Sequence, residues 1–392
     1  MSGRARRICV FTGSRADYGL LRGLIRALAN DPRVNLDIVA AGAHLRADLG
    51  STVAAIDDDG FVPAAKIDFV QEADTPVATA TALGLATIRL TEAFDRLRPD
   101  IVVVLGDRYE ALAAAQSAMM LNIPIAHIHG GEATEGLIDE AVRHAISKMA
   151  HLHFTAAAPY RARVIQLGEH PDRVFNVGAP GLDNLSDMRL LSRSELSSAL
   201  GFDCSRFVLV TLHPVTLDRS PPEQALEALV VALDRFPNLA VIATKSNADA
   251  NGRRLNAVLE ARTAQRKGRW LVAASLGQQR YLSALALADA VVGNSSSGII
   301  EAPSLGVPTV NIGERQRGRL RAPSVIDCGS DEGAIRAAID RALSPAFRAI
   351  AARRETPYGS GGASLRIAAT LKSFPLDGVL FKRFFDLREA AE

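Results

Sequence analysis

The most regular feature of the chain is an alternation of short apolar runs with longer amphipathic segments. The apolar runs are rich in Val, Ile and Leu and contain few polar residues, which is typical of parallel strands covered on both faces. Between them, apolar residues recur with a helical period, for example over residues 18–30, 109–121 and 333–344. Repeated strand–helix alternation predicts an α/β protein with doubly wound parallel sheets.

The apolar runs fall into two sets, separated by a stretch without strand character. The first set is RICVFTG, LDIVAAG, IVVVLGD, IPIAHIHG, LHFTAA and VFNVG; the second is FVLVTLH, LAVIATK, WLVAA, AVVGN, VPTVNIG and SVIDC. Residues 179–200 contain no strand pattern, so we predict a linker there. This gives a Rossmann-like domain over residues 1–180, a second over 190–365, and a C-terminal helical tail over 366–392, in which two helices flank a Pro–Gly break.

Composition and charge narrow the class of protein. Lys and Arg (45) nearly balance Asp and Glu (43) in the 392 residues, so the net charge of +2 carries no electrostatic footprint for nucleic acid. No apolar stretch approaches the roughly 20 residues of a membrane helix, and the start does not match a signal peptide. The three cysteines are far apart, without metal-ligand spacing, which favours reduced thiols in a cytoplasmic protein.

Polar residues follow several of the predicted strands, where open parallel sheets bind their ligands. Arg15 and Asp17 follow the first strand, and His44 follows the second. Asp107 and Arg108 come directly after the apolar run 101–105. For the two aspartates the alternative is a helix N-cap, and for His44 it is a solvated loop. Since no G-x-G-x-x-G motif is present, a dinucleotide cofactor is disfavoured.

The segment HIHGGEATEGLIDEAVRH, residues 127–144, gathers titratable groups at a strand end. We expect His127 to be a packed core histidine, whereas His129, Glu132 and Glu135 fall in a loop that can reach a ligand. Carboxylates crowded in this way can acquire the separated pKa values that acid/base catalysis needs. The alternative is an acidic helix start that complements the helix dipole.

The helix that follows this loop is expected to be amphipathic. Its predicted apolar face consists of Ile138, Val142, Ala145 and Met149. On that reading Asp139, Glu140, Arg143 and His144 lie away from the core, with Asp139 and Arg143 sharing one face.

The second half contains a candidate phosphate site. The strand AVVGN runs into Ser295 and Ser296 at a helix start, where hydroxyls and free backbone N–H groups bind phosphate. Glu301 lies on the first turns of that helix, where it can accept from a ribose diol, and Arg315 can neutralise phosphate charge. Further strand-end candidates are His213 and Asn247. A phosphate site without a P-loop or Rossmann glycine motif indicates a sugar nucleotide more than ATP or NAD; the alternative makes the serines simple caps.

Motifs spread over the chain resemble one enzyme family. TGSRADYG, GAHL, GDRYEALAAA, HIHGGE-x-TEG-x-IDE-x-x-RHAI-x-K, HPVT, GNSSSGI-x-EAP and PTVNIG-x-RQ-x-GR occur in order. Together they are similar to the hydrolysing UDP-N-acetylglucosamine 2-epimerases over residues 7–370. The resemblance implies two Rossmann-like domains facing a cleft in a glycosyltransferase-B-like arrangement. It also implies UDP bound mainly by the second domain, no metal or nicotinamide, and a homodimer or homotetramer.

The resemblance also implies a reaction and roles for residues. A base removes the C2 proton of a UDP-2-acetamido sugar, UDP leaves C1, and the 2-acetamidoglycal is hydrated with inversion at C2. The free manno-configured sugar is a precursor of sialic-acid-like nonulosonates. Asp107 and Asp139 match two catalytic carboxylates, and Asp17, His44 and Arg143 are expected near the sugar. The residues that match the UDP-binding set are Arg15, Arg108, His213, Asn247, Ser295, Ser296, Glu301 and Arg315.

The chain departs from the family pattern at one position. Members acting on UDP-N-acetylglucosamine carry HIEGGE, with a catalytic Glu where this chain has His129. The third proton carrier is therefore Glu132, Glu135 or His129 itself. This loop resembles the subgroup acting on UDP-N,N′-diacetylbacillosamine on the legionaminic acid route. Alternative functions are a glycosyltransferase of the same fold, a non-hydrolysing epimerase and a non-catalytic UDP-sugar sensor.

Overall fold

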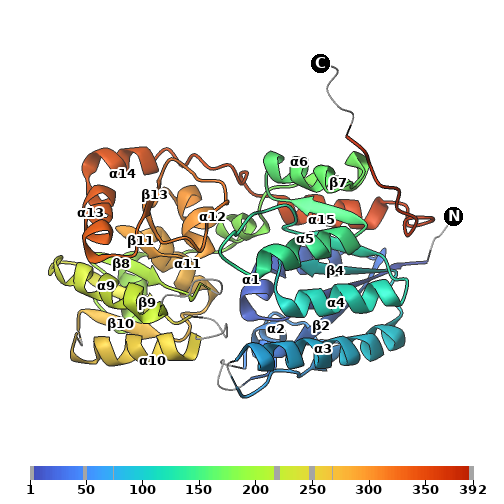
Figure 1. The fold of residues 1–392 in the computed structure, drawn as a ribbon, viewed down its shortest axis with the longest axis horizontal. Helices are drawn as coiled ribbons and strands as arrows, with labels where there is room; N and C mark the ends of the chain where they lie inside the picture. The colour runs from blue at the N-terminus through green and yellow to red at the C-terminus, as the bar shows by residue number, and fades with distance from the viewer. Residues whose placement is uncertain are drawn as a thin grey trace. The chain divides into compact units, whose positions relative to one another are not determined.

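The computed structural model describes residues 4–46, 51–73, 75–215, 221–246, 252–266 and 268–387. Figure 1 shows two groups of helices and strands, and the chain divides into two compact units accordingly. The first unit comprises residues 1–132, 139–184 and 358–392; the second comprises 133–138 and 185–357. The change of unit after Asn184 falls inside the predicted linker, and the chain returns to the first unit at Tyr358.

The first unit is built on a seven-stranded parallel sheet of order β3-β2-β1-β4-β5-β6-β7. Its strands are β1 (Arg6–Thr12), β2 (Val34–Ala41), β3 (Ala65–Ile67), β4 (Ile101–Leu105), β5 (Ile125–Ile128), β6 (Leu152–Thr155) and β7 (Val174–Asn176). Every strand predicted for this half is present. The pattern missed only β3, because three residues at a sheet edge, with Lys66 exposed, carry too little apolar signal.

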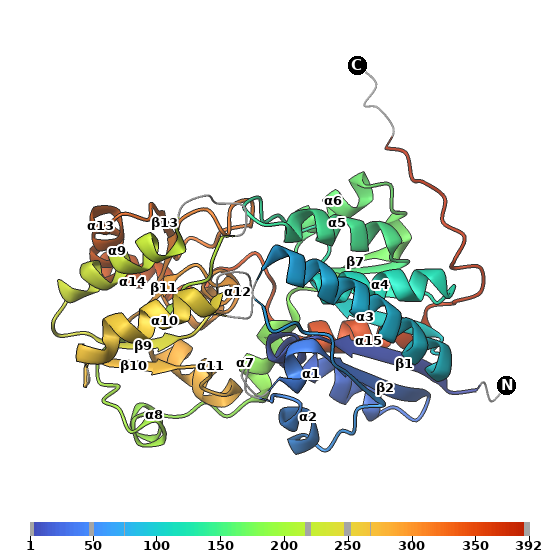
Figure 2. The same cartoon turned by 60° about the horizontal axis from the view of Figure 1, so that its bottom comes forward.

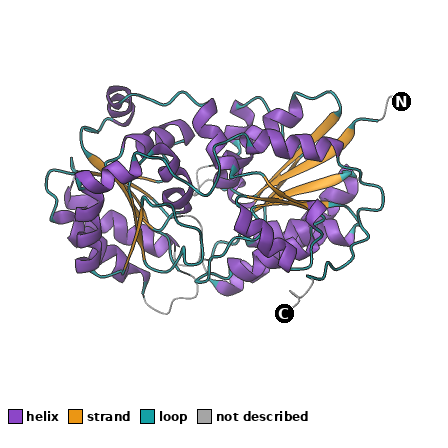
Figure 3. Ribbon diagram, turned by 90° about the horizontal axis from the view of Figure 1, so that it is seen from above, coloured by secondary structure: helices purple, strands orange, loops and turns teal. Residues whose placement is uncertain are grey.

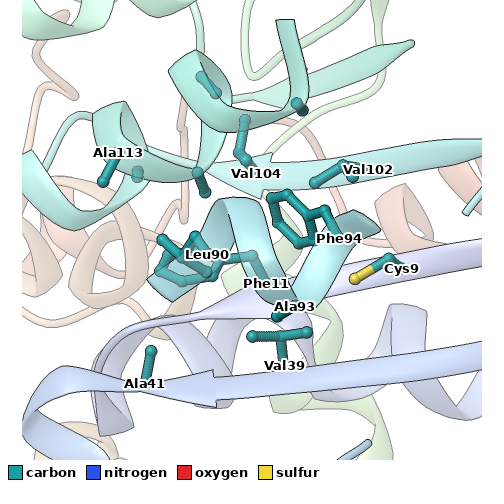
Figure 4. Packing of buried hydrophobic residues seen from close by; sticks show 14 of the residues in the cluster. Cys9, Phe11, Val39, Ala41, Leu90, Ala93, Phe94, Val102, Val104 and Ala113 are labelled. Carbon is teal, nitrogen blue, oxygen red and sulfur yellow. The ribbon is translucent and has the colours of Figure 1, made fainter. Parts of the chain in front are cut away.

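Helices cover both faces of this sheet. They are α1 (Arg15–Ala29), α2 (Ala54–Asp58), α3 (Pro76–Leu97), α4 (Tyr109–Met120), α5 (Asp139–Met149), α6 (Ala158–Gln166) and α15 (Ala363–Ser373), with 3₁₀ turns η1 (Gly42–Leu45), η3 (Pro171–Arg173) and η4 (Pro180–Leu182). Because side chains alternate along a strand, Cys9 and Phe11 pack with α3, α4 and α5, whereas Ile8 and Val10 pack with α1 and α15. Figure 4 shows the first of these layers, with Phe94 packed among strand residues.

The second unit repeats the architecture with a six-stranded parallel sheet of order β10-β9-β8-β11-β12-β13. Its strands are β8 (Phe207–Thr211), β9 (Ala240–Thr244), β10 (Trp270–Ala273), β11 (Ala290–Gly293), β12 (Thr309–Ile312) and β13 (Val325–Cys328). Its helices are α8 (Arg193–Leu200), α9 (Pro222–Asp234), α10 (Gly252–Thr263), α11 (Gln278–Leu287), α12 (Ser296–Leu305), α13 (Glu332–Leu343) and α14 (Pro345–Ala351), with the 3₁₀ turn η5 (Ala264–Arg266) after α10. Figure 3 shows helices on both sides of the strands in each unit.

The last part of the chain differs from the prediction in two ways. First, α15 packs against α1 in the first unit, and Asp183 of the short helix α7 (Asp183–Asp187) accepts hydrogen bonds from the backbone N–H groups of Ala363 and Ser364. Residues 358–365, assigned to the second domain from the sequence, therefore belong to the first unit.

Second, no helix follows the Pro–Gly break in the described part of the tail: residues 381–387 are irregular, and Figure 2 shows them as a ribbon without a helix. The prediction of a second tail helix is wrong for these residues, and its last part, residues 388–392, lies outside the described residues. Tertiary contacts hold this segment in place instead, since the Lys382 ammonium pairs with Glu169 at 2.7 Å and the Phe385 N–H donates to the Gly168 carbonyl at 2.9 Å.

Both sheets place their strands in the Rossmann order, so the predicted α/β fold of two Rossmann-like doubly wound units is confirmed. In each sheet the order reverses next to the first strand, between β1 and β4 and between β8 and β11. No helix in the described part of the chain is both long enough and apolar enough to cross a membrane.

Candidate active site

The polar residues predicted in the first unit gather at one edge of its sheet. Strands β1, β4 and β5 are parallel neighbours, so their carboxyl ends lie side by side at the point where the strand order reverses. Arg15 and Asp17 lie in the first turn of α1, directly beyond β1. Asp107 and Arg108 follow β4, and His129 follows β5.

A carboxylate that sequence reasoning missed lies between the first two of these strand ends. Glu110, in the first turn of α4, is buried and accepts from the Arg108 Nε at 2.6 Å. Burial, followed by the nearby charge of Glu110, raises the pKa of Asp17 to about 6, while Arg108 opposes the shift. The signal was present, since Glu110 is a charged residue on the buried face of a helix that is otherwise rich in alanine.

Arg143 lies at the centre of the next group, although the sequence placed it away from the core. Its side chain is only 1% exposed, whereas Ile138 is 49% exposed and Ala145 is also exposed. The buried stripe of α5 consists of Arg143, Ile146 and Ser147 and continues in Ala150 directly after the helix, with the spacing of one helix face. The predicted face was wrong at Ile138 and Ala145, whereas Val142 and Met149 do pack against the core. At position 143 a buried ion pair takes the place of an apolar contact.

The guanidinium group of Arg143 connects three elements. Its Nε donates to the Asp107 Oδ2 at 3.0 Å, and its Nη2 contacts the same atom. Its Nη1 donates to Glu140 at 2.6 Å and to the Glu132 carbonyl at 2.9 Å. Burial alone would lower the pKa of Arg143, but the charges of Asp107, Glu132 and Glu140 raise it above its usual value. The Asp107 carboxylate is therefore fixed in position and paired with a permanent positive charge.

The loop after β5 makes a tight turn in which His129 meets Glu132. The His129 backbone is left-handed, with φ at +67°, and its N–H donates to the Phe154 carbonyl at 2.9 Å. The ring Nδ1 is hydrogen-bonded to the Glu132 Oε1. Both residues are buried, at 8% and 1% exposure.

The other candidates from this loop lie elsewhere. Glu135 belongs to the second unit, is 54% exposed, and pairs with Arg317 at 2.9 Å. Asp139 begins α5 and is partly buried. His144 pairs with Glu140 at 3.0 Å.

Two histidines near these strand ends are fully buried inside hydrogen-bond networks. His44 bonds Thr12 through Nε2 at 2.9 Å and Thr52 through Nδ1 at 3.0 Å, and burial lowers its pKa to about 4. This geometry favours a structural role over the contact with the sugar that the resemblance implies. His127 bonds the Gly106 carbonyl at 2.7 Å and Ser147 at 3.1 Å, which confirms it as a core histidine.

In the second unit, Asn294 organises the strand ends on either side of the reversal point. Its amide accepts from the His213 N–H at 2.7 Å and donates to the His213 carbonyl at 2.8 Å. Its own carbonyl accepts from Arg315 at 3.2 Å and from the buried Gln316 at 2.8 Å. Sequence reasoning missed Asn294 and Gln316, although Asn294 directly follows the apolar strand β11.

Serines and a partly buried tyrosine surround the start of α12. Ser295 is the N-cap, and Ser296 is the first helical residue. Burial raises the pKa of the Tyr281 hydroxyl to about 12; hydrogen bonding with Ser297, Ser295 and Thr211 opposes this rise, and the charge of the buried Glu301 adds to it. Asn247 lies outside the described residues. The described residues contain no group of three or more His, Cys, Asp or Glu side chains that could hold a metal ion.

Comparison with known proteins shows the family of this chain. Residues 26–372 match the model of the UDP-N-acetylglucosamine 2-epimerase family. The chain belongs to this family. It is an enzyme of the 2-epimerase type, as the ordered motifs predict.

Three curated relatives of this epimerase are similar over almost their whole length. A Campylobacter jejuni protein named GDP/UDP-N,N′-diacetylbacillosamine 2-epimerase (hydrolyzing) is 38% identical over 97% of this chain and 99% of its own. A Legionella pneumophila protein named UDP-N,N′-diacetylbacillosamine 2-epimerase (hydrolyzing) is 36% identical over 96% and 98%. An Escherichia coli polysialic acid biosynthesis protein is 34% identical over 98% of both chains.

Solved structures share the fold of this epimerase. A Listeria monocytogenes structure described as a UDP-N-acetylglucosamine 2-epimerase superposes with a TM-score of 0.79 at 20% identity, covering 95% of this chain and 96% of its own. The Neisseria meningitidis UDP-GlcNAc 2-epimerase bound to UDP-GlcNAc gives a TM-score of 0.78 at 18% identity, covering 93% and 99%.

Proposed function

We propose that this epimerase is a hydrolysing enzyme that converts UDP-N,N′-diacetylbacillosamine into UDP and the free 2-epimeric sugar. The choice of substrate rests on one position: this chain has His129 where family members acting on UDP-N-acetylglucosamine have a glutamate. Two full-length relatives at 38% and 36% identity are named for the diacetylbacillosamine substrate. The same reaction on UDP-N-acetylglucosamine is the second candidate, supported by the family model.

The second unit supplies the residues proposed to bind UDP. Backbone N–H groups and hydroxyls at the start of α12 suit phosphate, and Arg315 adds a positive charge. Glu301 is buried and suited to accept hydrogen bonds from the ribose. The backbone of His213 is held by two hydrogen bonds with the Asn294 side chain, one accepted and one donated by Asn294. Arg15 and Arg108 of the first unit are proposed to meet the same nucleotide.

The first unit supplies the residues proposed for proton transfer. The elimination breaks the C2–H and C1–O bonds, forms the C1=C2 bond, and leaves the electron pair of the C1–O bond on UDP. Such a step needs a proton acceptor near C2 and positive charge near the departing pyrophosphate. Asp107 and Asp139 are the proposed carboxylates, and Asp17, whose pKa is raised to about 6, is proposed to contact the sugar.

The free sugar is proposed to enter nonulosonate biosynthesis. A relative at 34% identity is named for polysialic acid biosynthesis, which supports a product that is built into acidic nine-carbon sugars. For the diacetylbacillosamine substrate, the corresponding product leads to legionaminic acid.

One experiment tests the reaction and its substrate. The purified chain is incubated in deuterated water with UDP-N,N′-diacetylbacillosamine, GDP-N,N′-diacetylbacillosamine or UDP-N-acetylglucosamine, and NMR follows the C1 and C2 signals. We expect UDP and a free sugar that is inverted and deuterated at C2, with the diacetylated UDP sugar turned over fastest. Equal turnover of the two UDP sugars would break the link between His129 and the substrate.

The same incubation separates the rival functions. A glycosyltransferase of this fold would release UDP only when an acceptor is present. A non-hydrolysing epimerase would return a UDP sugar, and a sensor would bind UDP without consuming the substrate. Any of these results would contradict the proposed hydrolysing reaction.

A further inference from the structure

The pairing of His129 with Glu132 is the arrangement in the first unit that best suits proton donation. The Glu132 carboxylate is hydrogen-bonded to Nδ1, and among the described residues Nε2 has no hydrogen-bond partner. A carboxylate on one ring nitrogen fixes the orientation of an imidazole and stabilises its protonated form, so that the other nitrogen can deliver a proton. The His129 side chain keeps about a tenth of its surface exposed, whereas Glu132 is almost completely enclosed.

The turn that creates this pair is held from several sides. Arg143 donates to the Glu132 carbonyl, and Arg163 of α6 donates to the Gly131 carbonyl. Gly131 has φ at +79°, and a Cβ there would collide with the Tyr160 carbonyl. A Cβ on Gly130 would lie 2.9 Å from the Ser147 hydroxyl oxygen. The two glycines therefore let the backbone press against α5 and α6, which fixes His129 in its left-handed conformation.

The surroundings of the pair distinguish it from the carboxylates of Asp107 and Glu135. Asp107 is bound to the guanidinium group of Arg143, which stabilises its ionised form and makes it a poor proton donor. Glu135 is more than half exposed and pairs with Arg317 in the second unit. Other charged or titratable residues packed around the turn, among those described, are Arg163, Glu140, Tyr160 and the buried His127.

We propose that His129 is the general acid that donates a proton from Nε2 to C2 of the glycal intermediate, and that Glu132 is the residue that positions it. This inference rests on the proposed hydrolysing reaction. It assigns the third proton carrier to a carboxylate–histidine pair instead of a single carboxylate. The buried pair does in this chain what the glutamate of the HIEGGE pattern does in other members.

The proposed reaction has two steps, an elimination and a hydration. In the elimination, a carboxylate takes the C2 proton, and UDP leaves with the electron pair of the C1–O bond. In the hydration, the imidazolium transfers its Nε2 proton to the opposite face of C2, using the electrons of the C1=C2 bond, and a water oxygen bonds to C1 and loses a proton to solvent. The carboxylate then returns its proton through solvent to the imidazole, so each turnover releases the free sugar, UDP and one proton.

His129→Asn is the primary test. Asparagine tolerates the left-handed backbone better than most residues but does not titrate, so the turn is expected to fold. UDP release is measured separately from the formation of free sugar, and NMR detects the glycal. We expect the glycal to accumulate and free sugar to form at least 100-fold more slowly, since a general acid contributes roughly 10²–10⁴-fold. UDP affinity should stay within threefold of wild type.

Glu132→Gln tests the positioning role. The amide can still hydrogen-bond to Nδ1 but no longer stabilises the imidazolium, so the pH above which hydration fails should move to lower values. KM should change less than kcat, and Glu132→Asp should recover part of the activity. A residue that only supports the fold would lower activity without moving this pH limit. The matched control is His170→Gln, an exposed histidine in the same unit that should retain full activity.

The outcomes separate the two levels of the proposal. If the wild-type chain releases no UDP from either UDP sugar, the proposed function itself fails. If the wild type turns over but His129→Asn forms free sugar within threefold of its rate without accumulating glycal, the assignment of the general acid is overturned. The assignment would also be overturned if Glu135→Gln, and not His129→Asn, caused the large loss in the rate of free-sugar formation. An unmoved pH limit in Glu132→Gln would remove the positioning role.

Discussion

Replacing Arg143 with methionine should destabilise the first unit, because the groups that now pair with the guanidinium would lose this partner. Arg143 is 1% exposed, and its loss leaves Asp107, Glu140 and the Glu132 carbonyl without that donor. Removing one partner of a buried ion pair costs about 3–5 kcal/mol. The side chains of Asp107 and Glu140 are 20% and 28% exposed, so water screens part of this cost. We therefore expect a loss of about 2–3 kcal/mol.

Urea denaturation followed by circular dichroism measures this loss. Trp270, the one tryptophan of the sequence, lies in β10 of the second unit, and its fluorescence reports that unit separately. Arg143→Lys should recover part of the loss, since it keeps the charge but not the planar fork of donors. The control is Arg96→Met, which removes an exposed guanidinium of α3 and should cost less than about 0.5 kcal/mol. If Arg143→Met were as stable as this control, the ion-pair argument would be refuted.

Three further substitutions test the site. As pH rises from about 4 to about 6, the wild type should lose stability of order 1 kcal/mol, because the folded state holds the Asp17 proton more tightly than the unfolded chain does. Asp17→Asn should abolish this loss. Urea denaturation at several pH values across this range measures whether the free energy of unfolding still falls with pH in the variant. His44→Leu should lower the free energy of unfolding by about 2–3 kcal/mol, because two threonine hydroxyls lose their hydrogen-bond partner, and should leave the KM for the sugar nucleotide unchanged. A raised KM at unchanged stability would instead place His44 against the sugar. Asn294→Ala should weaken UDP binding about tenfold, as measured by calorimetry, because the His213 backbone loses both hydrogen bonds with the amide. An unchanged affinity would show that these two hydrogen bonds are not needed to position His213 for UDP binding.

The apolar pattern predicted most of the fold because buried parallel strands are apolar throughout and therefore visible in sequence. It failed at β3, which is too short, and at residues 381–387, whose aromatic residues suggested a helix. The tail is held by contacts with residues far away in the chain, such as that of Lys382 with Glu169. A local pattern of hydrophobic residues cannot predict such contacts.

At the site, the sequence by itself determined which chemical groups follow which strands, because connections in a doubly wound sheet place strand ends at one edge. It supplied the carboxylates, the α12 serines and the unusual His129. Only the tertiary structure decided which of these groups pair. Arg143 looked exposed by helical period, yet the charges of Asp107, Glu132 and Glu140 stabilise it inside the protein. The pairing of His129 with Glu132 likewise depends on a left-handed backbone that the packing of two glycines against α5 and α6 imposes.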